Sequence, residues 1–340
     1  MLIPQLEAYS VAIGVPVRNE IKRLPHLLTA LAQQQGRLSF VLCLFFDNCT
    51  DGSINFVQRR AAALPFSIVS DYCHAGDSPS AGAARRRAMA LALRSAPDGT
   101  LLTTDADSEP ALDWVATNLA ALEHADVVVG RITRGERRVP DKLDRMDAYL
   151  ERLHQLRRII DPVPWEAPET HHWTSGASTA VWADVYRQLG GFEPVRSGED
   201  GKFVEAAAQA GYRVRRDATV LVKTSSRRAG RAPDGLATTL AACDRTPVLP
   251  RVAHPEDMVW RFRQHANARA AYHTGAFATL AAALQLPWDQ VSQVAAESIN
   301  DEAFVSRIVG VPRGGMRSIG LAHAEKLLSD LEQIDPLEVA

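Results

Sequence analysis

Three short acidic clusters have residue types that could bind a cation or move a proton. In TTDADSEP, Asp105 and Asp107 flank a single small residue. Two carboxylates this close repel each other unless a cation lies between them. Oxygen ligands on a short loop suit Mg²⁺ or Mn²⁺, which also bind waters and substrate phosphates. The alternative is a solvated acidic turn or a helix cap, because this triplet is common by itself.

The other two clusters could either bind a ligand or cap a helix. In FFDNCTDGS, Asp47 directly follows an apolar run, where an unpaired buried carboxylate would be costly, so we expect it to accept hydrogen bonds from a ligand. Asp51 or Ser53 is expected to cap the next helix. In RSGEDGKF, Glu199 and Asp200 stand at an expected helix start, where the helix dipole favours acidic residues. The functional interpretation is a general base that takes a proton from an attacking hydroxyl.

The elements that must position these clusters alternate between strands and helices over about the first 130 residues. Apolar runs and helical periods predict strands at 9–17, 39–46, 66–72, 99–104 and 125–132, separated by helices at 24–34, 54–63, 81–96 and 112–123. Such alternation is typical of βαβ units around a parallel sheet. Ligands bind at the carboxyl ends of the strands in open α/β sheets, so the polar clusters that follow the strands are expected on one edge of one sheet.

The pattern changes after residue 134. Residues 134–160 predict a charged amphipathic helix, either a plain surface helix or a lid. A proline-rich loop, a short strand, two helices and a strand over 215–226 follow. From about Thr238 onward the Ala-rich sequence has a helical period and no convincing strands. We therefore expect two domains, residues 1–235 and residues 236–340, the second a helical appendage.

Composition excludes several classes of protein. The 340 residues include 38 Lys+Arg and 40 Asp+Glu, and the net charge of −2 gives no electrostatic reason to expect nucleic acid or an anionic membrane as partner. No apolar run reaches the roughly 18–20 residues that span a bilayer. MLIPQLEAYS has no secretory signal pattern. The four cysteines lack metal-site spacing and are expected as reduced thiols in a cytoplasmic protein without a transmembrane segment.

Six segments, taken in chain order, resemble glycosyltransferase family two. They are VAIGVPVRNE, FFDNCTDGS, AGAARRRAMALA, TTDADSEP, TSGASTAVWADVYRQLGGF and SGEDGKF. Each segment is weak alone, but their order is specific, and the resemblance covers about residues 9–235. It implies an α/β fold of GT-A type, with a Rossmann-like, mainly parallel sheet flanked by helices. It also implies a nucleotide-sugar co-substrate bound by residues 1–235.

The resemblance implies roles for individual residues around the nucleotide. Matching positions are Pro16, Asn19, Glu20, Asp47, Arg85, Arg86 and Asp105. Asp47 matches the aspartate that recognises the base of the nucleotide. Arg85 and Arg86 are alternatives for one arginine near the nucleotide, because a run of three arginines leaves the register open.

Further positions match the cation site and the general base. Asp105 and Asp107 match the DxD motif, with Asp107 as the direct ligand of a divalent cation, Mn²⁺ or Mg²⁺, that bridges the diphosphate. Glu199 and Asp200 match the ED pair, in which Asp200 corresponds to the general base of inverting members.

The sugar-binding positions matched are Gly176 and Ala177, beside the donor sugar and acceptor. Trp173 is a candidate aromatic platform for the acceptor; the alternative is ordinary packing.

Two features depart from the family pattern. Many members have a histidine after the strand that follows the ED helix, as a further metal ligand, but LVKTSSRRAGRA has none. Arg227 and Arg231 could contact phosphate directly, and the third metal ligand stays open among His171, His172 and His254, which are more typical of ordinary polar positions. The QxxRW motif and membrane helices of processive synthases are absent, which predicts addition of one sugar per event.

We therefore expect a metal-dependent, hexosyltransferase-like enzyme that moves one sugar from a nucleotide-sugar to an acceptor hydroxyl, with inversion. A nucleotidyltransferase is an alternative, although GVPVRNE lacks the Gly-rich, cation-bearing phosphate loop expected of one. A non-catalytic sugar-nucleotide-binding protein is another. The sugar, the base and the acceptor stay open. The helical tail could bind acceptor, cover the site or form a homodimer.

Overall fold

The computed structural model describes residues 9–36, 39–73, 80–134, 142–225, 245 and 249–333. The chain forms two compact units. The first comprises Met1–Glu136, Ala167–Ala206 and Val214–Thr238, and the second comprises Arg137–Glu166, Ala207–Arg213 and Thr239–Ala340. The sequence boundary at residue 235 stays a prediction, and the second unit also includes the charged helix expected near 134–160.

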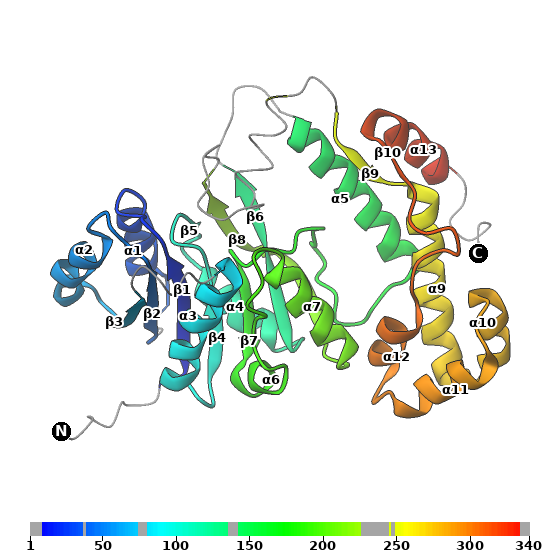
Figure 1. The fold of residues 1–340 in the computed structure, drawn as a ribbon, viewed down its shortest axis with the longest axis horizontal. Helices are drawn as coiled ribbons and strands as arrows, with labels where there is room; N and C mark the ends of the chain where they lie inside the picture. Colours follow the sequence, from blue (N-terminus) through cyan, green and yellow to red (C-terminus); the bar gives the residue numbers. More distant parts are fainter. Residues whose placement is uncertain are drawn as a thin grey trace. The chain divides into compact units, whose positions relative to one another are not determined.

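The first unit is built on an eight-stranded sheet with the order β3-β2-β1-β4-β7-β6-β8-β5. Its strands are β1 (Val11–Val17), β2 (Val41–Asp47), β3 (Ser67–Cys73), β4 (Thr100–Thr103), β5 (Glu109–Pro110), β6 (Val127–Arg134), β7 (Thr179–Trp182) and β8 (Val214–Thr224). Strands β1 to β4 pair in parallel, as do β6 and β8. Strand β7 runs antiparallel to both β4 and β6, and β5 is antiparallel to β8. The expected α/β fold of GT-A type, with a mainly parallel sheet flanked by helices, is confirmed (Figure 1).

Helices follow most of these strands at the positions that the sequence predicts. They are α1 (Leu24–Ala32), α2 (Ser53–Arg60), α3 (Ala81–Ser95), α4 (Trp114–Leu122), α6 (Ala183–Gln188) and α7 (Glu199–Gln209). The Ser80 hydroxyl caps α3 by accepting a hydrogen bond from the Ala83 N–H. Gly190 and Gly191, with φ of 73° and 75°, end the α6 segment, as the Gly-Gly pair predicts.

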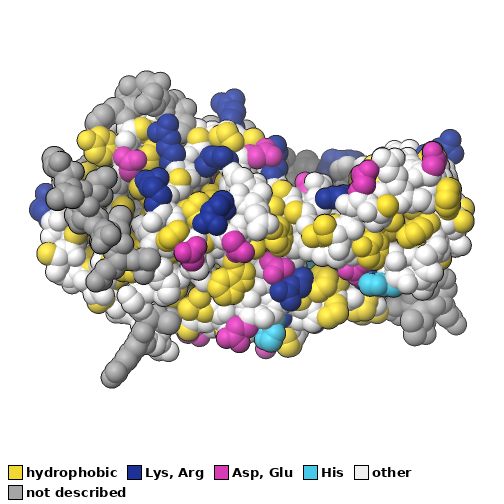
Figure 2. Space-filling view, turned by 90° about the horizontal axis from the view of Figure 1, so that it is seen from below, with side chains coloured by type: hydrophobic (Ala, Val, Ile, Leu, Met, Phe, Trp, Pro, Cys, Tyr) yellow, Lys and Arg dark blue, Asp and Glu magenta, His cyan; other side chains and the backbone are white. Residues whose placement is uncertain are grey.

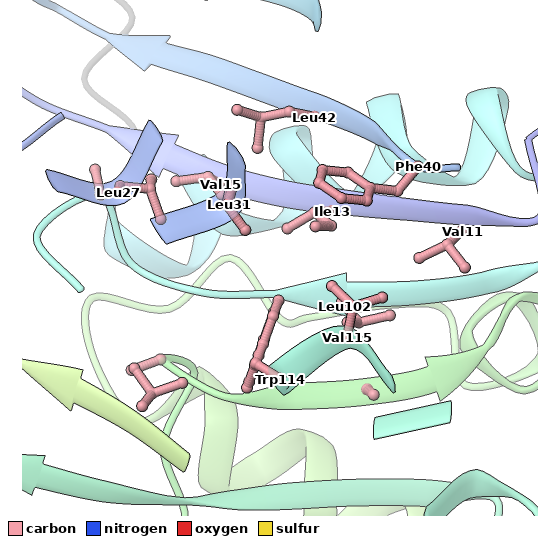
Figure 3. Close-up of a cluster of buried hydrophobic side chains, with 14 of the residues drawn as sticks. Val11, Ile13, Val15, Leu27, Leu31, Phe40, Leu42, Leu102, Trp114 and Val115 are labelled. Carbon is pink, nitrogen blue, oxygen red and sulfur yellow. The ribbon is translucent and has the colours of Figure 1, made fainter. Parts of the chain in front are cut away.

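The core of the first unit is packed from strand and helix side chains. All seven residues of β2 are buried, as its uninterrupted apolar run predicts. Figure 3 shows Ile13 and Val15 of β1, Leu42 of β2 and Leu102 of β4 gathered in this core. The largest fully buried side chain is the indole of Trp114, at the start of α4.

The second unit is mainly helical. Its helices are α5 (Lys142–Ile160), α9 (Pro255–Thr274), α10 (Phe277–Leu284), α11 (Trp288–Glu297), α12 (Asp301–Ile308) and α13 (Leu321–Gln333). Helix α9 packs against α5, α10, α12 and α13 (Figure 1). Helix α5 buries Tyr149, Leu153 and Leu156 in the core of this unit, which accounts for its amphipathic pattern.

The expectation that the C-terminal region lacks strands was wrong. Strands β9 (Arg251–Ala253) and β10 (Ser318–Gly320) pair antiparallel. Three residues are too few to show an alternating pattern, and the partners lie far apart in the chain, so no local signal predicts them.

Two further sequence expectations concern the surface and the thiols. The face shown in Figure 2 exposes both basic and acidic side chains, as expected for a net charge near zero. None of the helices in the described ranges is long and apolar enough to cross a bilayer. Cys43, Cys49 and Cys73 are free thiols, and Cys243 lies outside the described residues.

Candidate active site at the carboxyl edge of the sheet

The loops after β1 and β2 are tied together by side-chain to backbone hydrogen bonds. The Asn19 Oδ1 accepts from the Thr50 N–H at 2.7 Å, and the Glu20 N–H donates to the Ser53 Oγ at 3.1 Å. Asn19 adopts a left-handed φ of 54°, which a short polar side chain tolerates. Pro16, near the end of β1, lies beside Phe45 of β2 in the parallel register. The structure thus brings Pro16, Asn19 and Glu20 to one end of the sheet.

The carboxylate of Asp47 lies at the end of β2, and its side chain is only 4% exposed. Its Oδ1 accepts from the Asn48 Nδ2 at 2.7 Å, and its Oδ2 lies 3.5 Å from the Arg18 Nη1. The Oδ1 of Asn48 is buried without a hydrogen-bond partner among the described residues. Such an atom is costly to leave unsatisfied, which marks this end of β2 as a place where a ligand could add a donor after a small rearrangement.

Asp51, which with Ser53 was one of two residues expected to cap α2, bonds to the start of that helix, although the residue at the cap position is Gly52. Its Oδ1 accepts from both the N–H and the hydroxyl of Ser53, at 3.0 Å and 2.6 Å. Burial alone would raise the pKa of Asp51, but the hydrogen bonds from Ser53 and from the Ile21 N–H outweigh it and lower that pKa. Asp51 therefore accepts hydrogen bonds that stabilise the local fold, from Ser53 and the Ile21 N–H, and Asp47 does not share these partners.

Arg85 of α3 forms hydrogen bonds to several separate chain segments at the carboxyl edge of the sheet. Its Nη1 donates to the Thr103 Oγ1 at 3.0 Å and to the carbonyl of Gly176 at 2.8 Å. Its Nη2 donates to the Asp105 Oδ1 at 2.7 Å, and its Nε donates to the Glu199 Oε1 at 3.0 Å. Burial alone would lower the pKa of this guanidinium, but the two carboxylates outweigh burial and raise it. Arg85 is therefore a buried permanent cation shared by two acidic clusters.

Asp200 reaches the same point from the start of α7. Its Oδ2 accepts from the Gly176 N–H at 3.0 Å, and its Oδ1 accepts from the Gly201 N–H at 2.8 Å. Gly176 thus donates to Asp200 with its N–H while its carbonyl accepts from Arg85. The structure brings together residues from β4, α3, the loop before β7 and α7: Arg85, Thr103, Asp105, Gly176, Glu199 and Asp200.

Hydrogen bonds from core residues hold the loop before β7 in place. The Trp114 Nε1 donates to the Ser178 Oγ at 3.0 Å, and the Gly130 N–H donates to the Ser178 carbonyl at 3.0 Å. Ala177, an expected sugar-binding residue, is buried between Gly176 and Ser178. A Cβ on Gly130 would lie 2.2 Å from the Ser178 Oγ, so only glycine permits this approach. Sequence reasoning missed the contacts of Thr103, Trp114 and Ser178. Thr103 and Ser178 lie within the quoted segments TTDADSEP and TSGASTAVWADVYRQLGGF, but nothing local in the sequence names their partners.

The aromatic and histidine candidates differ in their surroundings. Trp173 is partly buried, packs against the core and stacks at a tilt on His172, with ring centroids 5.0 Å apart. The Nδ1 of His171 accepts from the Trp173 N–H at 3.1 Å, and its Nε2 lies 3.0 Å from the Val129 carbonyl. Both ring nitrogens of His171 are thus engaged with backbone. His254 caps α9 through its Nδ1. The contacts of His171 thus use both of its ring nitrogens, whereas the helix cap of His254 uses its Nδ1.

The remaining expected residues lie apart from this hydrogen-bond network. Arg86 is exposed, and its Nη1 donates to the Phe192 carbonyl at 2.8 Å. The structure therefore separates the two arginines that the sequence left as alternatives, with Arg85 inside and Arg86 at the surface. Arg227 and Arg231 lie outside the described residues.

The carboxylate oxygens of the DxD segment could supply some of the ligands of a hard divalent cation. Asp107 is half-buried, and Asp105 keeps its Oδ2 beside the Oδ1 that bonds Arg85. No group of three or more His, Cys, Asp or Glu that could hold a metal occurs in the described part of the chain. Mg²⁺ and Mn²⁺ are commonly held by one or two carboxylates together with substrate phosphates and waters, so these two aspartates fit a cation that arrives with a diphosphate.

Comparisons with known proteins give structural neighbours only. No family model and no curated protein matches the sequence. The chain is similar in structure to TarS 1–349 of S. aureus in complex with UDP-GlcNAc, with 15% sequence identity, coverage of 86% of this chain and 72% of that chain, and a TM-score of 0.46. It is also similar to the mannosyltransferase PcManGT from Pyrobaculum calidifontis in complex with GDP-Man and Mn²⁺, with 19% identity, coverage of 88% and 86%, and a TM-score of 0.46.

A further structure of TarS 1–349 is matched with 17% identity over 64% of this chain, at a TM-score of 0.43. Here the chain spans 61% of the matched protein, less than two thirds of its length. At these TM-scores the likeness does not by itself assign a function to this chain.

Proposed function

We propose that this protein is a glycosyltransferase that moves one sugar from a nucleotide-sugar donor to an acceptor hydroxyl. The observation that carries the proposal is the direct linkage of the DxD segment to the ED pair: Asp105 and Glu199 share Arg85, and Asp200 bonds Gly176 beside them. A carboxylate pair suited to a diphosphate-bound cation and a separate carboxylate suited to base catalysis thus meet at one sheet edge. That division fits glycosyl transfer, whereas glycoside hydrolysis uses two facing carboxyl groups.

In the proposed reaction, the carboxylate of Asp200 takes the proton of the acceptor hydroxyl. The hydroxyl oxygen forms a bond to the anomeric carbon of the donor sugar. The bond between that carbon and the diphosphate oxygen breaks, and its electron pair leaves with the nucleoside diphosphate. Attack opposite the leaving group inverts the anomeric configuration, and a single attack adds one hexose per event.

Asp107, with the Oδ2 of Asp105, would hold the divalent cation against the diphosphate. When bound, the cation neutralises negative charge that develops on the leaving group. Asn19, Glu20, Asp47 and Asn48 lie at the neighbouring strand ends, where the nucleoside would bind, and Trp173 is the candidate platform for the acceptor.

Thermal unfolding with a panel of nucleotide-sugars tests the proposal first. The panel contains UDP-, GDP-, ADP- and dTDP-linked sugars, each measured with Mn²⁺ and with EDTA. A ligand at 100 times its dissociation constant adds about 2.7 kcal/mol of stability, which gives a shift of several degrees. We expect one nucleotide to stabilise the protein, and to do so only with Mn²⁺.

Matched aspartate variants give the control. Asp107→Asn should lose the Mn²⁺-dependent shift, whereas Asp113→Asn should keep it, because Asp113 is exposed and makes no side-chain cap at α4. Product NMR should then show an inverted anomeric centre. Binding without turnover on any acceptor would favour the non-catalytic binding protein. Transfer of the nucleoside monophosphate to an acceptor, with release of the sugar phosphate, would favour the nucleotidyltransferase.

A further inference from the structure

We propose that Arg85 is the positioning residue of this site: its guanidinium holds Asp105, Glu199 and the peptide of Gly176 together and thereby fixes the carboxylate of Asp200. This inference rests on the proposed function, since it states how the base of that reaction is held. Arg85 itself is buried, with 6% of its surface exposed, and is assigned no contact with substrate.

The first argument is the geometry of the guanidinium. Its donors reach three segments that are separate in the chain: the end of β4 through Thr103 and Asp105, the loop before β7 through Gly176, and the start of α7 through Glu199. A planar fork with five N–H donors can satisfy these acceptors at once, whereas the point charge of a lysine cannot. A single side chain therefore sets the register of all three segments.

The second argument is the path from Arg85 to Asp200. The peptide of Gly176 presents its carbonyl to the Arg85 Nη1 at 2.8 Å and its N–H to the Asp200 Oδ2 at 3.0 Å. Glu199, the chain neighbour of Asp200, is held by the Arg85 Nε. Asp200 is thus constrained by Arg85 on two routes. A Cβ at position 176 would lie 2.4 Å from the Arg85 Cζ, so the loop approaches the guanidinium as closely as only glycine allows.

The third argument is charge. The side chains of Glu199 and Asp105 are 7% and 33% exposed, and Arg85 is the cation that the structure places against both. Without that cation, the negative charges of Asp105 and Glu199 would repel each other with no compensation from this position. That repulsion would loosen the end of β4 and the start of α7, the segment that bears Asp200.

The experiment compares Arg85→Lys and Arg85→Gln with Arg94→Lys, an exposed arginine on the same helix. Steady-state kinetics are measured with the donor found in the nucleotide panel. For Arg85→Lys we expect kcat to fall at least tenfold while the donor KM changes less than threefold. For Arg85→Gln, which has neither the charge nor the planar set of donors, we expect a fall in kcat at least as large. Arg94→Lys should match the wild type.

Two results would overturn the proposal. One is a folded Arg85→Lys with unchanged kcat. The other is a raised donor KM at unchanged kcat, which would make Arg85 a nucleotide-binding residue. If the Arg85 variants do not fold, Gly176→Ala replaces them, because its Cβ displaces the guanidinium, with Gly310→Ala as control, where a Cβ meets nothing.

A second readout separates this inference from the proposed function. NMR of ¹⁵N-labelled glycine follows the amide of Gly201, whose N–H donates to the Asp200 Oδ1, with Gly201→Ala to assign the signal. That signal should move in Arg85→Gln and stay in place in Arg94→Lys, whether or not the protein turns over any nucleotide-sugar. An unchanged signal in Arg85→Gln would overturn the positioning role, and absence of turnover with a moved signal would count only against the glycosyltransferase proposal.

Discussion

The carboxylates at the sheet edge differ in what binds them. Asp105 and Glu199 accept from the Arg85 guanidinium, whereas the bonds found for Asp200 come from the backbone N–H groups of Gly176 and Gly201. Glu199 is therefore the carboxylate of the pair that holds Arg85, whereas Asp200 is the one that we propose as the base.

We expect Asp200→Asn to abolish transfer and to leave nucleotide affinity nearly unchanged. The amide keeps the shape and can accept one hydrogen bond, but it cannot take a proton, and a general base contributes about 10²- to 10⁴-fold to the rate. Turnover and calorimetric nucleotide titration check this together. Should affinity collapse as well, Asp200 would be a donor or cation ligand instead of a base.

Residue types and spacing predict Asp105, Asp107, Glu199 and Asp200 as site residues, because the first pair follows a strand and the second begins a helix, and their roles stay predictions. Nothing local predicts that Arg85 bonds Glu199, which lies 114 positions away in the chain. The three consecutive arginines cannot be told apart in the sequence. Which of them points inward depends on how α3 lies against the sheet.

At the scale of elements, the loop before β7 depends on a contact from α4. The fully buried indole of Trp114 donates to the Ser178 Oγ, two residues after Gly176. The core in Figure 3 therefore supports the candidate site through the Trp114 side chain. Strong apolar runs made β1, β2 and β6 predictable, whereas β5, β9 and β10 have two or three residues each and depend on distant partners.

We expect Trp114→Phe to lower the free energy of unfolding by about 2–4 kcal/mol, since it opens a cavity and leaves the Ser178 hydroxyl without its donor. Urea denaturation measures the change. Trp288→Phe is the control, because that indole is 61% exposed and should change stability by about 0.5 kcal/mol or less. A loss in Trp114→Phe no larger than that of the control would contradict the supporting role.

At the scale of the whole molecule, the helical unit has its own buried charge cluster. The His265 side chain is 24% exposed, its Nδ1 lies 3.9 Å from the Asp161 Oδ2, and its Nε2 is buried without a partner among the described residues. Burial, followed by the nearby guanidiniums of Arg261, Arg269 and Arg157, lowers the pKa of His265 to about 3 from its ordinary 6.5. The folded protein thus keeps this imidazole neutral.

We expect stability to fall as the pH is lowered from 6.5 towards 3. In that window the unfolded chain binds a proton on His265 that the folded protein does not, and this contributes at most about 1.4 kcal/mol per pH unit. The contribution is fully present above pH 6.5. Urea denaturation at pH 7.5, 5.5 and 4.5 should show a shallower loss for His265→Gln, whereas His124→Gln, an exposed site, should follow the wild type. Identical slopes for all three proteins would exclude His265 as the source.

The reversed strand β7 has a consequence for biosynthesis. As the ribosome releases the chain from its N-terminus, β1 to β4 can assemble early, because they pair only with one another and with β7. Strand β6 is synthesised before β7, but β7 lies between β4 and β6 in the sheet. Strand β6 therefore cannot pair with this sheet until Thr179–Trp182 emerge. Throughout that interval the outer edge of β4 stays open to pairing with other nascent chains. A pause in translation shortly before residue 179 would therefore prolong the period in which this protein is most prone to aggregate.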